Sequence, residues 1–422
     1  MAEFQELHQV DQNLQDITAK LINHLWDSRT TQSDHPLIMG GSTVEGAMVA
    51  RYFQAKDGKT VTKEVEVDNN ILLATIPRDC QHLLEEIPDK LGKLRILANE
   101  ELVSLIGNEV DRKAFVANQH SSFVDSFIAK ESVAGTIVFR ELEDPIKEIL
   151  ATAMKKNVEE IKLIPYGQVT KASTATDVEV IVSGDLFVQV SMDLAVMFEI
   201  TWWPKLAGDW IGRSRNWPSD AVIGDLTKHC FVIAKPSDDE KEKSSSTEMT
   251  YSFHHAEASL AILRSHKQRF VYLVYKSLVY KYIKPIDPET IPSFWGKTVM
   301  LWLCEQHPPD NAMWDDIISM LKHMFNSLLS SLQQRNLSYF FVPEINLLET
   351  LDETLKEKVE DALIHLIENI ENHIMDLPVL KAVEYYQNIY DISTKIYQQL
   401  LSNGNNGTQE TGRNPSYIRL FV

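Results

Sequence analysis

Lys63-Glu64-Val65-Glu66-Val67-Asp68 and Ser191-Met192-Asp193-Leu194-Ala195-Val196 are the two stretches that decide the fold. Both have the composition of β-strands, and residues two positions apart on a strand lie on the same face of a sheet. Glu66 and Asp68 therefore share a face. Asp193 interrupts a run that is otherwise mostly apolar, where a carboxylate is rare unless it is paired or bound to a metal. The pattern predicts three carboxylates that converge on neighbouring strands.

These three acids match the needs of phosphoryl transfer. Transfer from a nucleoside triphosphate uses two Mg²⁺ ions, one at the attacking hydroxyl and one at the leaving pyrophosphate. Mg²⁺ prefers hard oxygen ligands in octahedral geometry. Upstream, Gly41-Ser42 forms a turn whose backbone can approach a phosphate closely, and Glu45-Gly46 would begin the helix that follows it. The combination predicts a site for metal-bound nucleotides.

Each piece also has a simpler interpretation. A Glu-Val-Glu-Val-Asp run is most often an exposed strand face, and a single Gly-Ser pair carries little information. Glu64 with Glu66 would satisfy the same geometry as Glu66 with Asp68. We prefer Glu66 and Asp68 because the apolar Ile71-Leu72-Leu73 continues directly from them as a strand. Asp193 is the acid that is hardest to explain as a surface residue.

The composition is consistent with an intracellular enzyme. The chain has 422 residues, of which 44% are hydrophobic, enough to bury one large core or two lobes. Three cysteines, Cys80, Cys230 and Cys304, are far apart and odd in number, so buried thiols are favoured over a disulfide framework or a zinc site. The N-terminus lacks a secretory pattern, and no stretch approaches the ~20 apolar residues of a membrane span. We expect a cytoplasmic protein with no membrane partner.

Helical and strand patterns follow one another in a clear order. Apolar residues recur at helical spacing over 4–27 and 141–162, and a Ser-Gly-Asp turn at 183–185 joins two strand-like runs into a hairpin that leads to Asp193. A charged, serine-rich linker over 236–248 indicates a boundary between lobes. Beyond it, helical periodicity covers 256–283, 296–305, 314–334, 351–375 and 380–401. The predicted organisation is a core over 1–240, a helical lobe over 241–402 and a disordered tail over 403–422.

Six sequence blocks in a fixed order carry a resemblance to a known family. They are Gly41-Ser42-Thr43-Val44-Glu45-Gly46, Glu66-Val67-Asp68, Val190-Ser191-Met192-Asp193, Tyr251-Ser252-Phe253-His254-His255-Ala256-Glu257, Trp295-Gly296-Lys297-Thr298-Val299-Met300-Leu301-Trp302 and Tyr339-Phe340-Phe341-Val342-Pro343-Glu344-Ile345-Asn346-Leu347-Leu348. In these blocks the chain resembles the animal cyclic GMP-AMP synthase-like receptors of the Mab-domain nucleotidyltransferase superfamily. The resemblance implies an α+β, bilobal nucleotidyltransferase fold. It would have a mixed or antiparallel sheet core with long N-terminal helices, and an all-helical C-terminal lobe.

The resemblance also implies a function in innate immune signalling. Such an enzyme joins two nucleoside triphosphates, here ATP and GTP, into a cyclic dinucleotide of the cyclic GMP-AMP kind. Glu66, Asp68 and Asp193 would be the catalytic acids and would bind Mg²⁺ or Mn²⁺. Asp193 would also help to deprotonate the attacking ribose hydroxyl.

The remaining substrate contacts would come from the turn and from the helical lobe. By the resemblance, Gly41 and Ser42 would contact the donor triphosphate, and Lys297 would neutralise phosphate charge. Lys276 is a second candidate for that role. The simpler interpretation of Lys297 is an exposed lysine on a helix surface.

Related sensors are switched on by a ligand, and double-stranded RNA is the activator to consider here, with a STING-type receptor reading the product. The net charge of −19 opposes contact with a phosphate backbone, although a local basic groove remains compatible with it. The most basic stretch, over 264–284, contains five interleaved aromatic residues. It is either a nucleic-acid surface or a helix whose aromatic residues belong to the core, with some of its lysines serving substrate phosphates.

The sequence departs from the vertebrate enzyme in three places. The zinc-binding thumb is missing, because Leu263-Arg264-Ser265-His266 leads directly into the next helix, and this argues against a DNA sensor built on that thumb. Thr250 stands where the vertebrate enzyme has an arginine that contacts nucleotide, which leaves the base preference open. The segment over 74–140 is longer than in the vertebrate enzyme and has no assigned role.

Two other functions compete with the cyclase. A catalytically inactive nucleotide-binding or scaffold protein of the same superfamily would fit the departure at Thr250, although such proteins normally lose acids of the triad and this chain keeps all three. A polymerase that adds nucleotides to RNA ends shares the triad but needs an RNA channel. Incorporation of label into long RNA would separate it from a cyclase.

Overall fold

A computed structural model describes residues 37–39, 45, 51–54, 61–97, 99–106, 162–166, 176–183, 187–234, 248–287 and 290–377. The helices expected over 4–27 and 380–401 and the tail over 403–422 lie outside these residues. The helix expected over 141–162 does so too, apart from Lys162. That residue begins a strand, β6 (Lys162–Tyr166), so the predicted helix ends before it.

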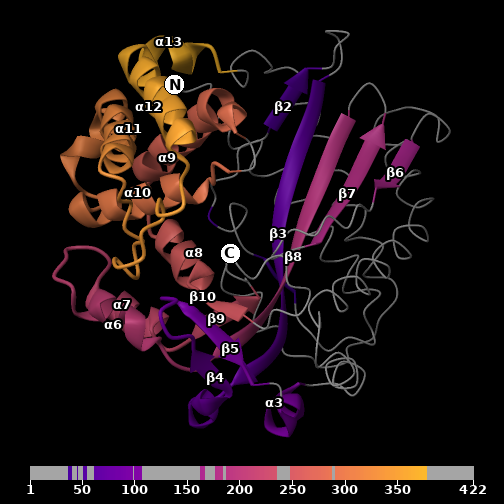
Figure 1. Ribbon diagram of the computed structural model, residues 1–422. Helices are drawn as coiled ribbons and strands as arrows, with labels where there is room; N and C mark the ends of the chain where they lie inside the picture. Colours follow the sequence, from indigo (N-terminus) through magenta and orange to yellow (C-terminus); the bar gives the residue numbers. More distant parts are fainter. Residues whose placement is uncertain are drawn as a thin grey trace, which may run out of the picture.

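Ten strands of the described residues form one mixed sheet (Figure 1). Two long strands, β3 (Val61–Ile76) and β8 (Phe187–Ile200), run parallel to each other at its centre, and the other neighbouring pairs are antiparallel. β3 follows the predicted acidic strand and continues through the apolar residues after Asp68, as expected. The remaining strands are β1 (Leu37–Met39), β2 (Arg51–Gln54), β4 (Leu84–Glu86), β5 (Lys93–Ile96), β6, β7 (Thr176–Ser183), β9 (Cys230–Ala234) and β10 (Glu248–Ser252).

Strand β8 changes its neighbour part of the way along its length. Its first part pairs with β7, from Val188 to Leu194, and its last residues pair with β9, from Met197 to Ile200. The β7–β8 pairing confirms the predicted hairpin. From β9 the sheet continues through β10 and β5 to β4 at its edge. Strand β8 therefore joins two parts of the one sheet.

Helices cover one side of this sheet in Figure 1. The periodic span 256–283 is two helices rather than one, because Ser265 and Gln268 form a capping box that begins a new helix after a short connection. A π-helical turn over Val279–Ile283 extends the second. The helices are α3 (Glu100–Leu105), α6 (Gly208–Gly212), α7 (Asp220–Leu226), α8 (His254–Ile262), α9 (His266–Leu278), α10 (Phe294–Gln306), α11 (Ile317–Gln333), α12 (Glu353–Glu368) and α13 (Ile370–Met375).

An aromatic cluster joins the helices to the sheet. The rings of Phe253 and Phe341 stack with centroids 4.9 Å apart, and Trp210 packs on Phe341 at 5.0 Å and Trp203 on Phe253 at 5.0 Å. The same core contains the buried ends of the central strands, among them Ile76 and Ile200. Burying rings of this size contributes a large part of the stability of a core. The sheet and the helices thus share one hydrophobic interior.

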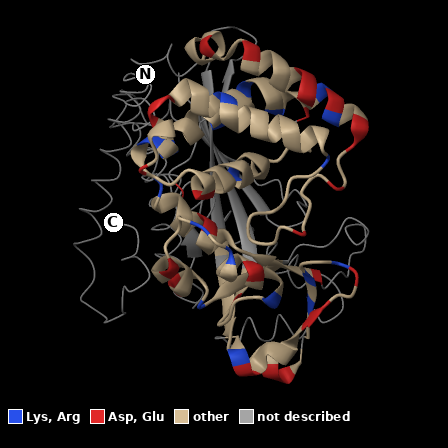
Figure 2. Ribbon diagram, turned by 90° about the vertical axis from the view of Figure 1, so that its left-hand side faces the viewer, with Lys and Arg blue, Asp and Glu red and all other residues tan. Residues whose placement is uncertain are grey.

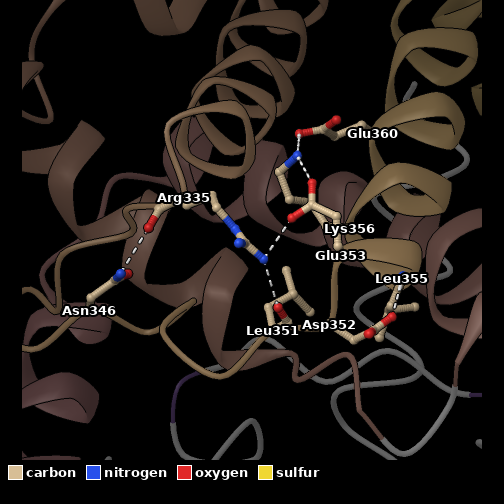
Figure 3. A network of polar contacts seen from close by, with 8 residues as sticks. All are labelled: Arg335, Asn346, Leu351, Asp352, Glu353, Leu355, Lys356 and Glu360. Carbon is tan, nitrogen blue, oxygen red and sulfur yellow. Dashed lines mark hydrogen bonds and ion pairs between the residues drawn. The ribbon is translucent and has the colours of Figure 1, made fainter.

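A polar network fixes the loop between α11 and α12 (Figure 3). Arg335 follows α11 with a φ of 51°, donates to the Leu351 carbonyl at 3.0 Å and pairs with Glu353 at 2.8 Å. Asn346 accepts hydrogen bonds from the backbone N–H groups of Leu337 and Leu348, both at 3.0 Å, and donates to the Arg335 carbonyl at 2.8 Å. The loop contains the last of the six sequence blocks. Its asparagine, Asn346, therefore stabilises the backbone of the loop through side-chain hydrogen bonds.

The expected α+β fold, with a mixed sheet and a helical C-terminal region, is confirmed. The division at residue 240 stays a prediction. Strand β10 lies after that point, yet it pairs with β9 and β5 inside the sheet. Among the helices that the structure describes, none has the length and apolar character needed to cross a membrane.

Candidate active site

The backbone register of the two central strands brings the predicted acids into one place. Asp68 on β3 pairs directly with Asp193 on β8, and Glu66 pairs with Ser191. Adjacent strands lie about 4.8 Å apart, so the positions of Asp68 and Asp193 are immediate neighbours. Glu64 pairs with Gln189, two residues further from Asp193. The prediction that Glu66 and Asp68 form the site with Asp193 stays a prediction, and this register is compatible with it.

Strand β7 adds two acidic positions that the sequence analysis did not nominate. Asp177 pairs with Asp193, and Glu179 pairs with Ser191. Asp68, Asp193 and Asp177 therefore form one row across three strands. The signal was present in the alternation of acidic and apolar residues over 176–182, but only the pairing of β7 with β8 shows that the two patterns meet.

The predicted phosphate-binding residues Gly41 and Ser42 lie outside the described residues. Glu45, three residues after Ser42, is described. It lies in a turn, and its side chain is 3% exposed. A buried carboxylate needs a partner that offsets the loss of water. Its partner is a residue that the sequence analysis had assigned to the substrate.

That partner is Lys297 of α10, whose Nζ lies 2.5 Å from Oε1 of Glu45. The same Nζ lies 3.0 Å from Oε2 of Glu257, which belongs to α8. The Lys297 side chain is only 17% exposed, so its interpretation as an exposed helix-surface lysine is wrong. Tyr339 completes the cluster, because its hydroxyl donates to Oε1 of Glu257 at 3.1 Å. We call these four residues the Lys297 cluster.

The Lys297 cluster contains two carboxylates, of Glu45 and Glu257, and one ammonium group, of Lys297. Burial alone lowers the pKa of Lys297, but the charges of Glu257 and then Glu45 outweigh it, so the pKa is raised and the ammonium stays protonated. Burial, followed by the charge of Glu257, raises the pKa of Tyr339 well above its usual range. Two carboxylates therefore surround one ammonium group. Glu257 and Tyr339 stand within two of the six sequence blocks, but nothing in the sequence shows that α8, α10 and the loop after α11 meet.

Lys276, the second phosphate candidate, lies elsewhere in the helical region. It is 5% exposed, and its Nζ lies 5.9 Å from the ring centroid of Tyr272 and 5.8 Å from that of Tyr280. It lines a small cavity with Tyr280, Lys284 and Ser293, between α9 and the start of α10. Lys297 is not among the residues that line this cavity. The two lysines thus occupy different environments, and the phosphate role of each stays a prediction.

The basic stretch over 264–284 packs mainly against the protein itself. Arg264 is 3% exposed, Arg269 donates to the carbonyls of Arg264 and Ile262, and Lys267 and Lys281 pair with acidic residues. Phe270, Tyr272 and Tyr275 are buried, which confirms the interpretation of these aromatic residues as core. Figure 2 shows acidic residues recurring along the outer helices, in keeping with the net charge of −19.

The chemistry of the donors decides which residues could hold a metal. Glu66, Asp68 and Asp193 would offer only hard oxygen ligands, the kind that Mg²⁺ and Mn²⁺ prefer. Where side chains are described, no group of three or more His, Cys, Asp or Glu residues has the arrangement of a metal site. Cys80, Cys230 and Cys304 are free thiols. Metal binding by Glu66, Asp68 and Asp193 stays a prediction.

Comparison with protein families identifies two adjacent regions. Residues 96–261 match the Mab-21 protein nucleotidyltransferase domain, and residues 271–365 match the Mab-21 protein HhH/H2TH-like domain. The first match contains Asp193, Glu257 and the strands β8, β9 and β10. Glu66 and Asp68 lie upstream of it. The second contains Lys297 and α10, α11 and most of α12.

Two insect proteins described as mab-21-like are similar to this chain. The one from Aedes aegypti is 24% identical over 222 residues, which are 51% of this chain and 57% of that protein. The one from Anopheles gambiae is 22% identical over 245 residues, which are 57% of this chain and 64% of that protein. The similarity thus covers less than two thirds of each relative. At the level of the superfamily, the chain is thus similar to a Mab-21 protein nucleotidyltransferase domain followed by a Mab-21 protein HhH/H2TH-like domain.

Proposed function

We propose that the protein is a metal-dependent nucleotidyltransferase that joins two nucleoside triphosphates, ATP and GTP, into a cyclic dinucleotide in the manner of the cyclic GMP-AMP synthase-like receptors. The observation that carries the proposal is the direct pairing of Asp68 with Asp193 on the two central strands of a chain with a Mab-21 nucleotidyltransferase domain. Phosphoryl transfer needs carboxylates that are held close together, and the strand register places the backbone positions of Asp68 and Asp193 side by side.

Each residue has a defined task in this proposal. Glu66, Asp68 and Asp193 hold Mg²⁺ or Mn²⁺, which supplies charge stabilisation at the transferring phosphate. Gly41 and Ser42 bind the donor triphosphate through backbone and hydroxyl groups. Asp193 accepts the proton of the attacking ribose hydroxyl. The hydroxyl oxygen forms a bond to the α-phosphorus of the donor, and pyrophosphate leaves. A second transfer of the same kind closes the ring and releases a second pyrophosphate.

The biological setting belongs to the same proposal. The enzyme would act in the cytoplasm, be activated by double-stranded RNA, and deliver its product to a STING-type receptor in innate immune signalling. Arg269, Lys267 and Lys281 of the 264–284 stretch already contact protein groups, which argues that an RNA activator would bind by another surface.

The test is a product assay on the purified protein. The protein is incubated with the four labelled nucleoside triphosphates and Mg²⁺ or Mn²⁺, with and without double-stranded RNA or DNA, and the products are resolved by chromatography. A phosphatase-resistant dinucleotide supports the proposal and names the bases, and dependence on one nucleic acid names the activator. Label in long RNA instead would identify a polymerase and contradict the cyclase.

A nucleotide-binding protein without turnover is the second candidate. It is favoured by Thr250 in β10, which stands where the vertebrate enzyme has an arginine that contacts nucleotide. Saturable binding of a nucleoside triphosphate by the wild-type protein, with no product under any condition of the assay, would support this candidate against the enzyme.

A further inference from the structure

The Lys297 cluster connects the region of the predicted phosphate turn to the helical region. Glu257, Lys297 and Tyr339 come from α8, α10 and the loop after α11, so three of its four members belong to the helices and the loop between them. Glu45 is the fourth, and it comes from the N-terminal part of the chain, three residues after Ser42. Among these four residues, only the Glu45–Lys297 ion pair links the N-terminal part of the chain to the helical region.

The Glu45–Lys297 ion pair is buried, so removing one partner should be costly for the protein. The side chains of Glu45 and Glu257 are 3% and 5% exposed. Removing the counterion of a buried carboxylate strongly destabilises the folded protein, because water cannot replace the lost partner. Both oxygens of Glu257 already have partners, Tyr339 on one and Lys297 on the other. Glu257 and Tyr339 thus hold the ammonium in place, and the ammonium in turn holds Glu45.

We propose that Lys297 is a positioning residue, which acts on the reaction by fixing Glu45, three residues after Ser42 in the sequence. This inference rests on the proposed function and deepens it. A direct phosphate contact by Lys297 is disfavoured, because one ammonium between two carboxylates leaves a net negative charge where the phosphate would have to approach. Lys297 would therefore affect nucleotide binding through Glu45 rather than by touching the nucleotide.

Hydrogen–deuterium exchange tests the tether without any need for activity. In Lys297→Met and in Glu45→Gln, exchange of the peptide over residues 40–50 is expected to rise about tenfold or more, relative to peptides of α11 and α12 in the same variant. Glu45→Gln keeps the shape of the side chain and covers the case in which Lys297→Met fails to fold. The control is Lys267→Met, which removes a lysine of an exposed ion pair with Asp315, 58% and 60% exposed, and should leave that peptide unchanged.

A double variant and steady-state kinetics complete the experiment. Glu45→Gln with Lys297→Met should exchange no faster than the more affected single variant, because both changes break the same link. In the product assay, Glu45→Gln should raise KM for the triphosphates more than it lowers kcat. Unchanged exchange at 40–50 in both single variants would overturn the tether. Faster exchange with unchanged kinetics in an active enzyme would overturn the positioning role. A wild-type protein without product would contradict the proposed function, while the exchange result would still decide the tether.

Discussion

The sheet and the helical region fix their predicted functional residues in different ways. In the sheet, backbone register alone places Asp68 opposite Asp193. In the helical region, Lys297 is placed by two ion pairs inside a packed interior. A side-chain change that keeps the strand pairing should therefore alter the chemistry and spare the fold. A change in the helical region should alter stability first and chemistry second.

The largest expected effect is a loss of turnover on changing Asp193 of β8. On the proposed mechanism, Asp193→Asn should lower turnover by about 100-fold or more, because it removes a predicted metal ligand whose charge would stabilise the transferring phosphate by several kcal/mol. The unfolding midpoint should stay within about 4 °C of wild type. The measurements are initial rates under activating conditions and a thermal melt.

Asp177→Asn is the matched control for that variant. Asp177 pairs with Asp193 from the other side but is not one of the three predicted ligands. It should keep turnover within about tenfold of wild type, a difference of about 1.4 kcal/mol. Full turnover in Asp193→Asn would mean that the site is misplaced, and an equal loss in both variants would mean that the acid set is larger than the triad.

The next effect tests the packing of the helical region. Gly296 begins the contact between α10 and α9, where an added Cβ would lie 2.4 Å from Cε1 of Tyr275. Gly296→Ala should destabilise the protein by about 1–3 kcal/mol through overpacking. Gly224 of α7 has no atom within 4 Å of such a Cβ, so Gly224→Ala should be neutral or stabilise by up to about 1 kcal/mol. Equal effects of both changes on urea unfolding would contradict the close contact.

A smaller effect should be a pH dependence of the unfolding free energy, caused by His254 and His255 at the start of α8. Burial first, and neighbouring positive charges second, lower the pKa of His254 to about 3, and burial followed by His229 lowers that of His255 to about 4. Both imidazoles stay neutral in the folded protein at pH 5, whereas in the unfolded chain they bind protons below about pH 6.5. The unfolded state then binds more protons, so stability falls as the pH falls from about 6.5 to 4.

His254→Asn isolates one of these two groups. For His254, the linkage amounts to about 2 kcal/mol between pH 7 and pH 5, at ~1.4 kcal/mol per pH unit below 6.5. His254→Asn should flatten the slope of unfolding free energy against pH in this window. A slope as steep as that of wild type would show that His254 already carries a proton in the folded protein.

The smallest effect should come from the outer surface of the helical region. Arg335 and Glu353 in Figure 3 are 50% and 52% exposed, so their ion pair is largely screened by water. Glu353→Gln should change the unfolding free energy by less than about 1 kcal/mol. A loss as large as that of Gly296→Ala would contradict the distinction between interior and surface in this region.

The sequence was sufficient for features that depend on local pattern. The acidic strand at 63–68, the hairpin before Asp193 and the helical C-terminal region each follow from periodicity that one element carries by itself. A new helix after Leu263-Arg264-Ser265-His266 was expected from the sequence, whereas the capping box of Ser265 and Gln268 that begins it is a finding of the structure. Helical periodicity alone did not locate this break, since the apolar spacing over 256–283 continues across it.

Features that depend on long-range pairing were not predictable. The alternation around Asp177 and the hairpin were visible in the sequence, but the position of Asp177 opposite Asp193 follows from the exact register of β7 with β8. Lys297 looked like a surface or substrate-facing lysine, since its two partners lie 252 and 40 residues away in the chain. Burial of a charged residue depends on such partners. Sequence reasoning therefore identified the strands on which the predicted acids lie, but not the groups that surround the lysine.

The most direct test of the central claim, that Asp68 and Asp193 form one metal site, is titration of the purified protein with Mn²⁺ alone, followed by electron paramagnetic resonance. Asp68→Asn and Asp193→Asn should each weaken Mn²⁺ binding by about tenfold or more, because each removes a charged oxygen ligand. The double variant should show no specific site at all. Wild-type affinity in either single variant would contradict the claim.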